Sequence, residues 1–283
     1  MSTLSEEQYK AIDDRIATSI RQKIIGRKLF PQPYGPLGFG KTVVTYDILS
    51  EVQKGRIDLT WGKGFSAEII GRTRVPLGVP VVHSEFEINR RDLEASRTGG
   101  MPLDMSSIDA AIYAVARKED DFLLQGWTVD GTNFDINVLY QGAGNDYNTS
   151  APWSTAANIL SSINGAIALL SADGVFPPFN LVVDPENFNE LYQMIANTSE
   201  WYYTKVKERI GGDIHQSPAM THGKGMLVAS PDPSLFDYAL GQDTVDESEE
   251  LSLKEGKGLF GIVYTCLVPR IKQPNAICKL SAI

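Results

Sequence analysis

Residues Met105–Trp127 constrain the fold most strongly, because their apolar pattern predicts one long amphipathic helix. The apolar side chains recur every three or four residues, at Ile108, Ala111, Ile112, Val115, Phe122 and Leu123. This spacing builds one face of a helix, and the charged residues 117–121 are expected largely off that face. Ser106 and Asp109 have the spacing of a capping box, and Gly126 is a suitable end. About twenty residues at roughly 1.5 Å each give a rod of about 30 Å, either an ordinary core helix or a spine for sheets.

Composition excludes several classes of protein. The 283 residues are 42% hydrophobic and 22% charged, as in soluble globular proteins, and they suffice for one large or two modest domains. The net charge of −9 argues against a nucleic-acid partner. No apolar run predicts a membrane span and the N-terminus has no signal core, so we expect a cytoplasmic protein. We expect Cys266 and Cys278 to be buried thiols, although a disulfide across neighbouring strands is an alternative.

The N-terminal residues predict a second amphipathic helix over Leu4–Gly26. Ser5 and Gln8 form a capping box, and Gly26 suits a left-handed C-terminal cap. An isoleucine stripe repeats every fourth residue, at Ile12, Ile16, Ile20 and Ile24. This stripe packs either on the body of the same chain or on another chain.

A turn-rich stretch, Phe30–Gly40, precedes a long extended segment, Thr42–Ile88, which is rich in β-formers. Nearly fifty residues without a helix are unusual inside a compact domain. The segment therefore forms either a small sheet or an arm that pairs with neighbouring subunits. An arm would imply an obligate oligomer with an interface of more than about 2,000 Å².

A short helix is expected at Arg90–Ser96, and a loop with a strand near 136–139 is expected at Asp130–Pro152. After this loop the sequence predicts an α/β unit. Its parts are a helix from Ser154 to Gly174, a buried strand at Asn180–Val183, and a helix that carries residues through Ile195. Asp184 caps this last helix, with Pro185 at its first position.

Three adjacent aromatic residues, Trp201, Tyr202 and Tyr203, form either a local cluster or a contact point such as a pore rim. Strands are expected at Gly225–Ser230, Leu235–Leu240, Leu259–Ile271 and Ala276–Ala282. Pro274 and Asn275 supply a turn between the last two, so these strands are predicted to close a sheet as a hairpin.

No catalytic or metal-binding constellation is visible in the sequence. His83, His215 and His222 lie in no HExxH motif and near no cysteine pair with metal-ligand spacing. There is no G-x-S-x-G elbow, and no pair of carboxylates stands out from a solvated surface. The residues therefore predict no enzyme, no metal and no cofactor.

Short motifs lie at Leu4–Asp13, Gly26–Lys28, Tyr34–Gly38, Ser107–Gly126, Ser171–Gly174, Leu181–Val183 and Leu240–Asp243. In this order the chain resembles the encapsulins, linocin-like shell proteins with the fold of tailed-phage major capsid proteins. The resemblance implies an α+β fold of the HK97 capsid type. It implies an N-terminal lumen-facing helix and turn (1–41), an extended E-loop (42–88), a peripheral domain with the spine helix and a sheet (89–153 and 226–283), and an axial α/β domain (154–225).

The resemblance also implies function: an icosahedral nanocompartment, assembled from copies of this chain, that encloses a peroxidase or a ferritin-like iron-handling enzyme. The cargo would bind through a short C-terminal targeting peptide, with no nucleic acid or membrane as partner. The residues implied for the cargo cleft are Ile12, Ile16, Ile20, Arg27, Leu29, Tyr238 and Leu240, and those for the axial pore loop are Glu200, Trp201 and Tyr202. The alternatives are a major capsid protein of a tailed virus or provirus, which the negative charge disfavours, and an enzyme in its own right.

Overall fold

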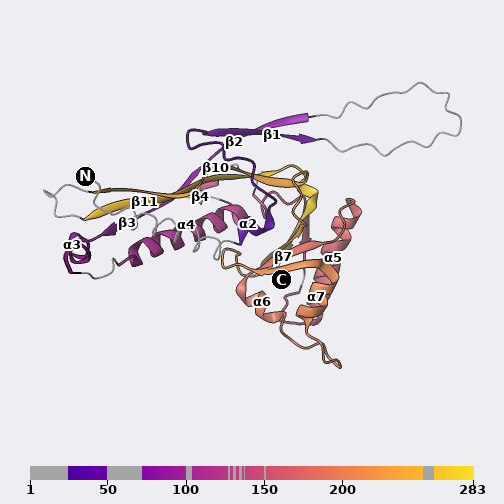
Figure 1. Cartoon of the computed structure of the whole chain (residues 1–283). Helices are drawn as coiled ribbons and strands as arrows, with labels where there is room; N and C mark the ends of the chain where they lie inside the picture. Colours follow the sequence, from indigo (N-terminus) through magenta and orange to yellow (C-terminus); the bar gives the residue numbers. More distant parts are fainter. Residues whose placement is uncertain are drawn as a thin grey trace, which may run out of the picture.

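The computed structural model describes residues 25–49, 72–99, 104–126, 128–129, 132–133, 136, 138–149, 151–250 and 258–283. The helix predicted over Leu4–Gly26 lies outside the described residues up to position 24, and so do Ile12, Ile16 and Ile20. The described chain has an elongated part, a compact part beside it, and a two-stranded ribbon that runs above them (Figure 1). Among the described helices, none has the length and apolar character needed to cross a membrane.

The elongated part is the predicted spine helix lying on a long antiparallel sheet. Helix α4 spans Ser106–Gln125, and the sheet has the order β10 (Phe236–Glu250), β11 (Leu259–Ile271) and β3 (Val81–Ile88). The buried core between helix and sheet consists of Val82, Phe86, Ile88, Ile108, Ala111, Ile112, Val115, Ala116, Leu259 and Val263. The period of the helix and its apolar face are therefore confirmed.

The ends of α4 agree with the sequence at one end only. Gly126 follows the helix with a φ of 98°, and its N–H donates to the carbonyls of Asp121 and Phe122, as a helix end requires. The predicted capping box is wrong, because Met105 occupies the cap position and makes no side-chain cap bond. The Asp104 carboxylate instead accepts the Ser106 N–H at 2.9 Å.

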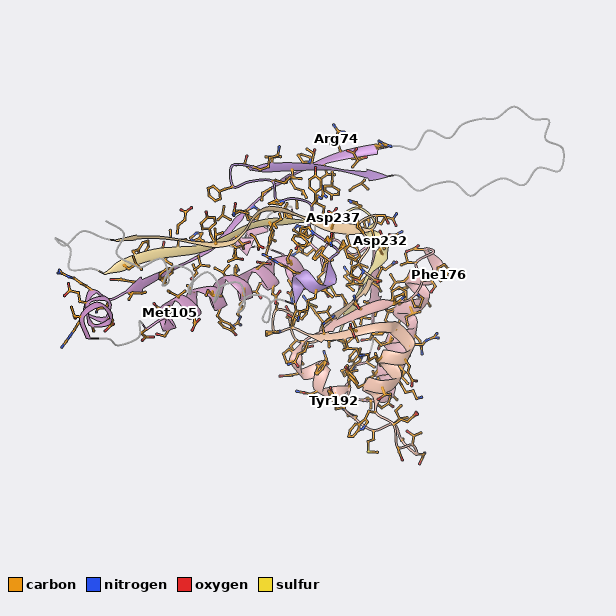
Figure 2. All side chains as sticks on the ribbon, in the orientation of Figure 1. Arg74, Met105, Phe176, Tyr192, Asp232 and Asp237 are labelled. Atoms are coloured by element: carbon orange, nitrogen blue, oxygen red, sulfur yellow. The ribbon has the colours of Figure 1, made fainter. Side chains whose placement is uncertain are left out.

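The described residues of the segment predicted to be extended, 42–49 and 72–88, form two different structures, and residues 50–71 lie outside the described residues. Strands β1 (Val43–Leu49) and β2 (Arg72–Gly78) pair antiparallel as the ribbon, which we call the arm, with Val43 opposite Gly78. Figure 1 shows the arm running above β10, and Figure 2 marks Arg74 on it. Strand β3 pairs with β11 in the long sheet. Helix α3 (Arg90–Gly99) follows, which confirms the expected short helix.

The compact part is the predicted α/β unit built on a five-stranded mixed sheet. The strand order is β6 (Asn145–Asn148), β12 (Ile277–Ser281), β9 (Lys224–Ala229), β7 (Phe179–Val183) and β8 (Gly211–Gln216). Its helices are α5 (Ala157–Ala172), α6 (Pro185–Glu190) and α7 (Tyr202–Ile210). The Asp184 carboxylate accepts the N–H groups of Glu186 and Asn187 at 3.2 and 3.4 Å, so the predicted cap is confirmed.

Three expectations about this region are wrong. The strands at the C-terminus form no hairpin, because β11 belongs to the long sheet and β12 to the five-stranded sheet; a 3-10 turn, Pro274–Ala276, carries the chain between them. Residues 136, 138 and 139 lie in no strand. The described strands of that loop are β5 (Thr132–Asn133), which pairs with β4 (Thr128–Val129), and β6. Helix α6 ends at Glu190 instead of continuing through Ile195. Cys266 and Cys278 are both buried and free, as expected.

Candidate functional site

Residues 25–41, which we call the strap, connect the N-terminal segment with the arm and run along both the spine helix and β10. The Phe30 ring contacts the rings of Phe236 and Tyr238 edge-on, with centroids 5.7 and 5.6 Å away. Further along, the Tyr34 N–H donates to the Tyr238 carbonyl at 2.9 Å, and the Leu240 N–H donates to the Tyr34 carbonyl at 3.0 Å. The strap is therefore fixed to β10 by ring packing and by backbone hydrogen bonds.

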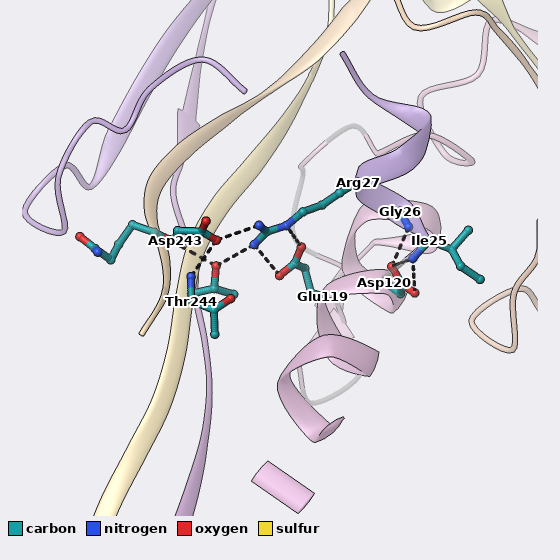
Figure 3. A network of polar contacts seen from close by, with 9 residues as sticks. Ile25, Gly26, Arg27, Glu119, Asp120, Asp243 and Thr244 are labelled. Carbon is teal, nitrogen blue, oxygen red and sulfur yellow. Dashed lines mark hydrogen bonds and ion pairs between the residues drawn. The ribbon is translucent and has the colours of Figure 1, made fainter. Parts of the chain in front are cut away.

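The strap begins at a cluster of charged side chains, the buried Glu119 and Asp120 together with Arg27 and the exposed Asp243, which we call the polar anchor (Figure 3). Asp120 Oδ1 accepts the N–H of Gly26 at 2.7 Å, and both carboxylate oxygens accept the N–H of Ile25 at 3.1 Å. These N–H groups start the short helix α2 (Gly26–Leu29). The Asp120 carboxylate thus serves as a cap supplied from a distant part of the chain.

Gly26 is where the strap comes closest to the spine helix. A Cβ at this position would lie 2.9 Å from Leu123 Cδ1 and 3.0 Å from Asp120 Oδ1. The expectation that Gly26 forms a left-handed C-terminal cap is wrong, because its φ is not positive and it is the first residue of α2. The glycine is needed instead for close packing, since any side chain would push the strap away from the helix.

Arg27 joins the spine helix to β10. Its Nε and Nη2 donate to the two carboxylate oxygens of Glu119 at 2.5 and 3.0 Å, and its Nη1 donates to Asp243 Oδ1 at 2.8 Å. The Glu119 side chain is fully buried, whereas the Asp243 side chain is 64% exposed. A two-point ion pair of this kind fixes orientation as well as distance.

Burial changes the titration of the anchor. It raises the pKa of Glu119 to about 7, against the attraction of the Arg27 guanidinium. Burial likewise raises the pKa of Asp120 to about 6, against the hydrogen bonds from Ile25 and Gly26. For Arg27 burial acts to lower the pKa, but the Glu119 and Asp243 carboxylates outweigh it and the pKa rises. Arg27 therefore stays a cation where Glu119 changes its charge.

The sequence pattern missed these buried charges. Glu119 and Asp120 were expected off the apolar face, yet Glu119 is 0% and Asp120 6% exposed, so that expectation is wrong. A signal was present, because Ala116, Glu119, Asp120 and Leu123 have the i, i+3, i+4, i+7 spacing of one helix face. Charge alone led to the assignment of this face to solvent. The partners of these two carboxylates in the strap, Gly26 and Arg27, lie more than ninety residues away in sequence.

The four described residues implied for the cargo cleft lie around the strap. Arg27 belongs to the polar anchor. Leu29 of the strap and Tyr238 and Leu240 of β10 are buried in the core, with 0%, 5% and 6% exposed. The strap and β10 therefore bring these residues into one region. Their contact with a cargo peptide, like that of Ile12, Ile16 and Ile20, stays a prediction.

The residues implied for the pore loop lie elsewhere: Glu200 and Trp201 end the connection between α6 and α7, and Tyr202 is the first residue of α7. Figure 2 places Tyr192, from the same connection, at the lower end of the molecule. Trp201 is 45% exposed, Tyr202 is buried at the start of α7, and the Glu200 carboxylate pairs with Lys205 at 3.0 Å. The Tyr192 ring stacks on that of Tyr203 with centroids 5.1 Å apart, so part of the aromatic group is a local cluster. Its position at a pore stays a prediction.

No group of three or more histidine, cysteine or acidic side chains within the described ranges is placed to hold a metal ion. His222 Nδ1 lies 3.3 Å from the Asp184 carboxylate and 3.1 Å from that of Glu186, which ties the loop before β9 to the start of α6.

Comparison with known proteins agrees with this architecture. The chain is 26% identical over 281 residues to the type 1 encapsulin shell protein EncA of Myxococcus xanthus, covering 98% of this chain and 93% of the relative. It is 28% identical over 277 residues to a diheme-cytochrome-encapsulin shell fusion protein of Kuenenia stuttgartiensis, covering 98% and 73%.

Among solved structures, a virus-like particle from Pyrococcus furiosus matches with a TM-score of 0.71 and 17% identity, covering 97% of this chain and 100% of that chain. The capsid of Myoviridae phage XM1 matches with a TM-score of 0.66 and 12% identity, covering 93% and 97%. These structures show the HK97-type capsid fold that the sequence implied. The family model described as encapsulating protein for peroxidase matches residues 1–246, and the chain therefore belongs to that family of encapsulin shell proteins.

Proposed function

We propose that this chain is the self-assembling subunit of a closed icosahedral shell that encloses a cargo enzyme. The observation that carries this proposal is the arm. A two-stranded ribbon is at best marginally stable in water unless it packs on other elements, and β1 and β2 pair with no other strand of the described chain. Val44, Tyr46 and Leu77 pack on the body, but much of the rest of the arm is uncovered. Five of the seven residues of β2 are exposed, and Val43 on β1 is 48% exposed. Packing on a second copy would supply the cover that the ribbon lacks.

The arm can be shortened while its fully buried residues are kept. Val44, Tyr46 and Leu77 are buried against the body, and Tyr46 lies opposite Val75 in the ribbon. Deleting residues 47–74 and joining Tyr46 to Val75 through Asn-Gly therefore leaves a two-residue hairpin on an intact base. The shortened protein should keep its circular dichroism spectrum and lose the ability to form closed particles. Particles of normal size from this variant would contradict the role of the arm.

The cargo side of the proposal concerns the N-terminal segment. An isoleucine stripe on an amphipathic helix suits a short apolar peptide, which we propose to be the C-terminal targeting peptide of a peroxidase or a ferritin-like enzyme. Deletion of residues 1–25 should then leave particles intact while cargo no longer copurifies with them. Copurification at the normal ratio would assign cargo binding to another surface.

A viral capsid is the second candidate, since phage capsids share the fold. The net charge of −9 favours the first candidate, because a container for DNA benefits from basic residues on its inner surface. We further propose a cytoplasmic shell without catalytic activity of its own, without nucleic acid, and with Glu200, Trp201 and Tyr202 near an axial pore. The ultraviolet spectrum of purified particles tests this choice, because packaged nucleic acid would add strong absorbance at about 260 nm.

A further inference from the structure

Glu119 and Asp120 join the spine helix to the strap through two adjacent buried carboxylates, and burying carboxylates is unfavourable in free energy. Moving a charge into the interior costs several kcal/mol, and an apolar pair of similar size often stabilises a protein as well or better. The polar anchor therefore calls for a reason other than stability. Directional bonds supply one, since they fix one geometry where apolar contacts tolerate several.

The hydrogen bonds between these two carboxylates and the strap all involve the first three residues of the strap. Asp120 takes the N–H groups of Ile25 and Gly26, and Glu119 takes the guanidinium of Arg27 on two atoms. A bound N–H at Ile25 sets the plane of the peptide bond that links it to residue 24. The anchor therefore fixes both the position and the direction in which the chain enters the strap from its N-terminal side.

We propose that Glu119 and Asp120 are positioning residues for the N-terminal segment, because they fix the place and the direction in which the chain reaches the strap at Ile25. The consequence for cargo rests on the proposed function, in which this segment forms part of the cargo cleft. If the segment is in its binding position for only a fraction of the time, the apparent affinity for cargo falls in proportion to that fraction. The anchor would thus set cargo affinity without touching the cargo.

Hydrogen exchange in the full-length protein tests this positioning directly. Asp120→Ala removes both acceptors, Asp120→Asn keeps one carbonyl oxygen that can cap as well as aspartate, and Asp121→Ala is a matched control at the next, half-buried position. Mass spectrometry follows peptides from residues 1–24, and a peptide from β11 reports on the body. We expect exchange of residues 1–24 to accelerate about fivefold to tenfold in Asp120→Ala and less than about twofold in the other two variants.

The outcomes distinguish a failure of the positioning proposal from a failure of the proposed shell function. Unchanged exchange of residues 1–24 in Asp120→Ala would overturn the proposal, and so would equal acceleration in β11, because the effect would then be general loosening. Should Asp120→Ala fail to fold, Glu119→Gln keeps the shape of the side chain and removes the charge that pairs with Arg27. It should accelerate the same peptides about threefold, and no acceleration would overturn the proposal. Size-exclusion chromatography of the same samples reports assembly separately, so absence of particles would count against the proposed function alone.

Discussion

Replacing Arg27 by methionine should destabilise the protein by an amount that grows with pH. Methionine keeps an unbranched apolar side chain, so the main loss is the cation beside the fully buried Glu119. The second partner, Asp243, is 64% exposed, and its loss should cost little. The variant therefore isolates the consequence of leaving one buried carboxylate without its counter-ion.

The pKa of Glu119 gives the size of the effect. In the parent protein burial raises this pKa from 4.5 to about 7, so the folded chain holds more protons than the unfolded chain between these values. The stability that Glu119 contributes is accordingly lost as the pH rises through that window, and it is constant above. Without the attraction of Arg27 the pKa rises further, which extends the loss to higher pH. The difference between variant and parent should therefore grow by about 1.4 kcal/mol per pH unit above about pH 7, reaching about 3 kcal/mol near pH 9.

The assay is thermal unfolding of parent and variant, each at about pH 6, 7, 8 and 9, followed by tryptophan fluorescence. Only the difference between the two proteins at each pH is interpreted, so contributions from assembly that both share cancel. The control is the pair Glu119→Gln and Arg27→Met/Glu119→Gln. Position 119 does not titrate in either protein, so the difference between these two should be nearly independent of pH. A flat difference for Arg27→Met alone, or one that is largest at about pH 6, would refute the reasoning.

Other substitutions test packing and charge in the rest of the fold. At Gly212→Ala the new Cβ would lie 2.2 Å from the Phe179 carbonyl oxygen, so the Tm should fall by the equivalent of about 1–3 kcal/mol, while Gly40→Ala, with nothing within 4 Å, should leave it unchanged. Equal Tm values for the two alanine variants would contradict the packing of β8 against β7. Asp237→Ala should cost about 3–5 kcal/mol, because it leaves the buried Arg270 without the carboxylate that it contacts twice at 2.6 Å. A Tm within about one degree of the parent would show that this ion pair is dispensable.

The sequence alone predicted the elements that rest on short-range periodicity. The spine helix, helix α5 and the capped start of α6 were all expected, because the apolar spacing and the Asp184-Pro185 pair act over a few residues. The resemblance to a known family supplied the overall architecture, which the relatives and the solved structures confirm.

What the sequence could not provide is pairing between distant residues. The turn at Pro274 predicted a hairpin, yet β11 and β12 pair with strands of two separate sheets. The residues of the turn contain no signal for this pairing. The same holds for Glu119 and Asp120, whose hydrogen-bond partners lie in the strap, far away in the sequence. Local pattern assigns charged residues to solvent, and only the tertiary contacts reverse that assignment.

Electron microscopy of the purified full-length protein at neutral pH tests the central claim most directly. The central claim is that the arm packs on other copies of the chain and that the N-terminal segment binds a cargo enzyme. It predicts hollow, closed particles of uniform diameter. A monodisperse monomer or dimer under the same conditions would contradict it.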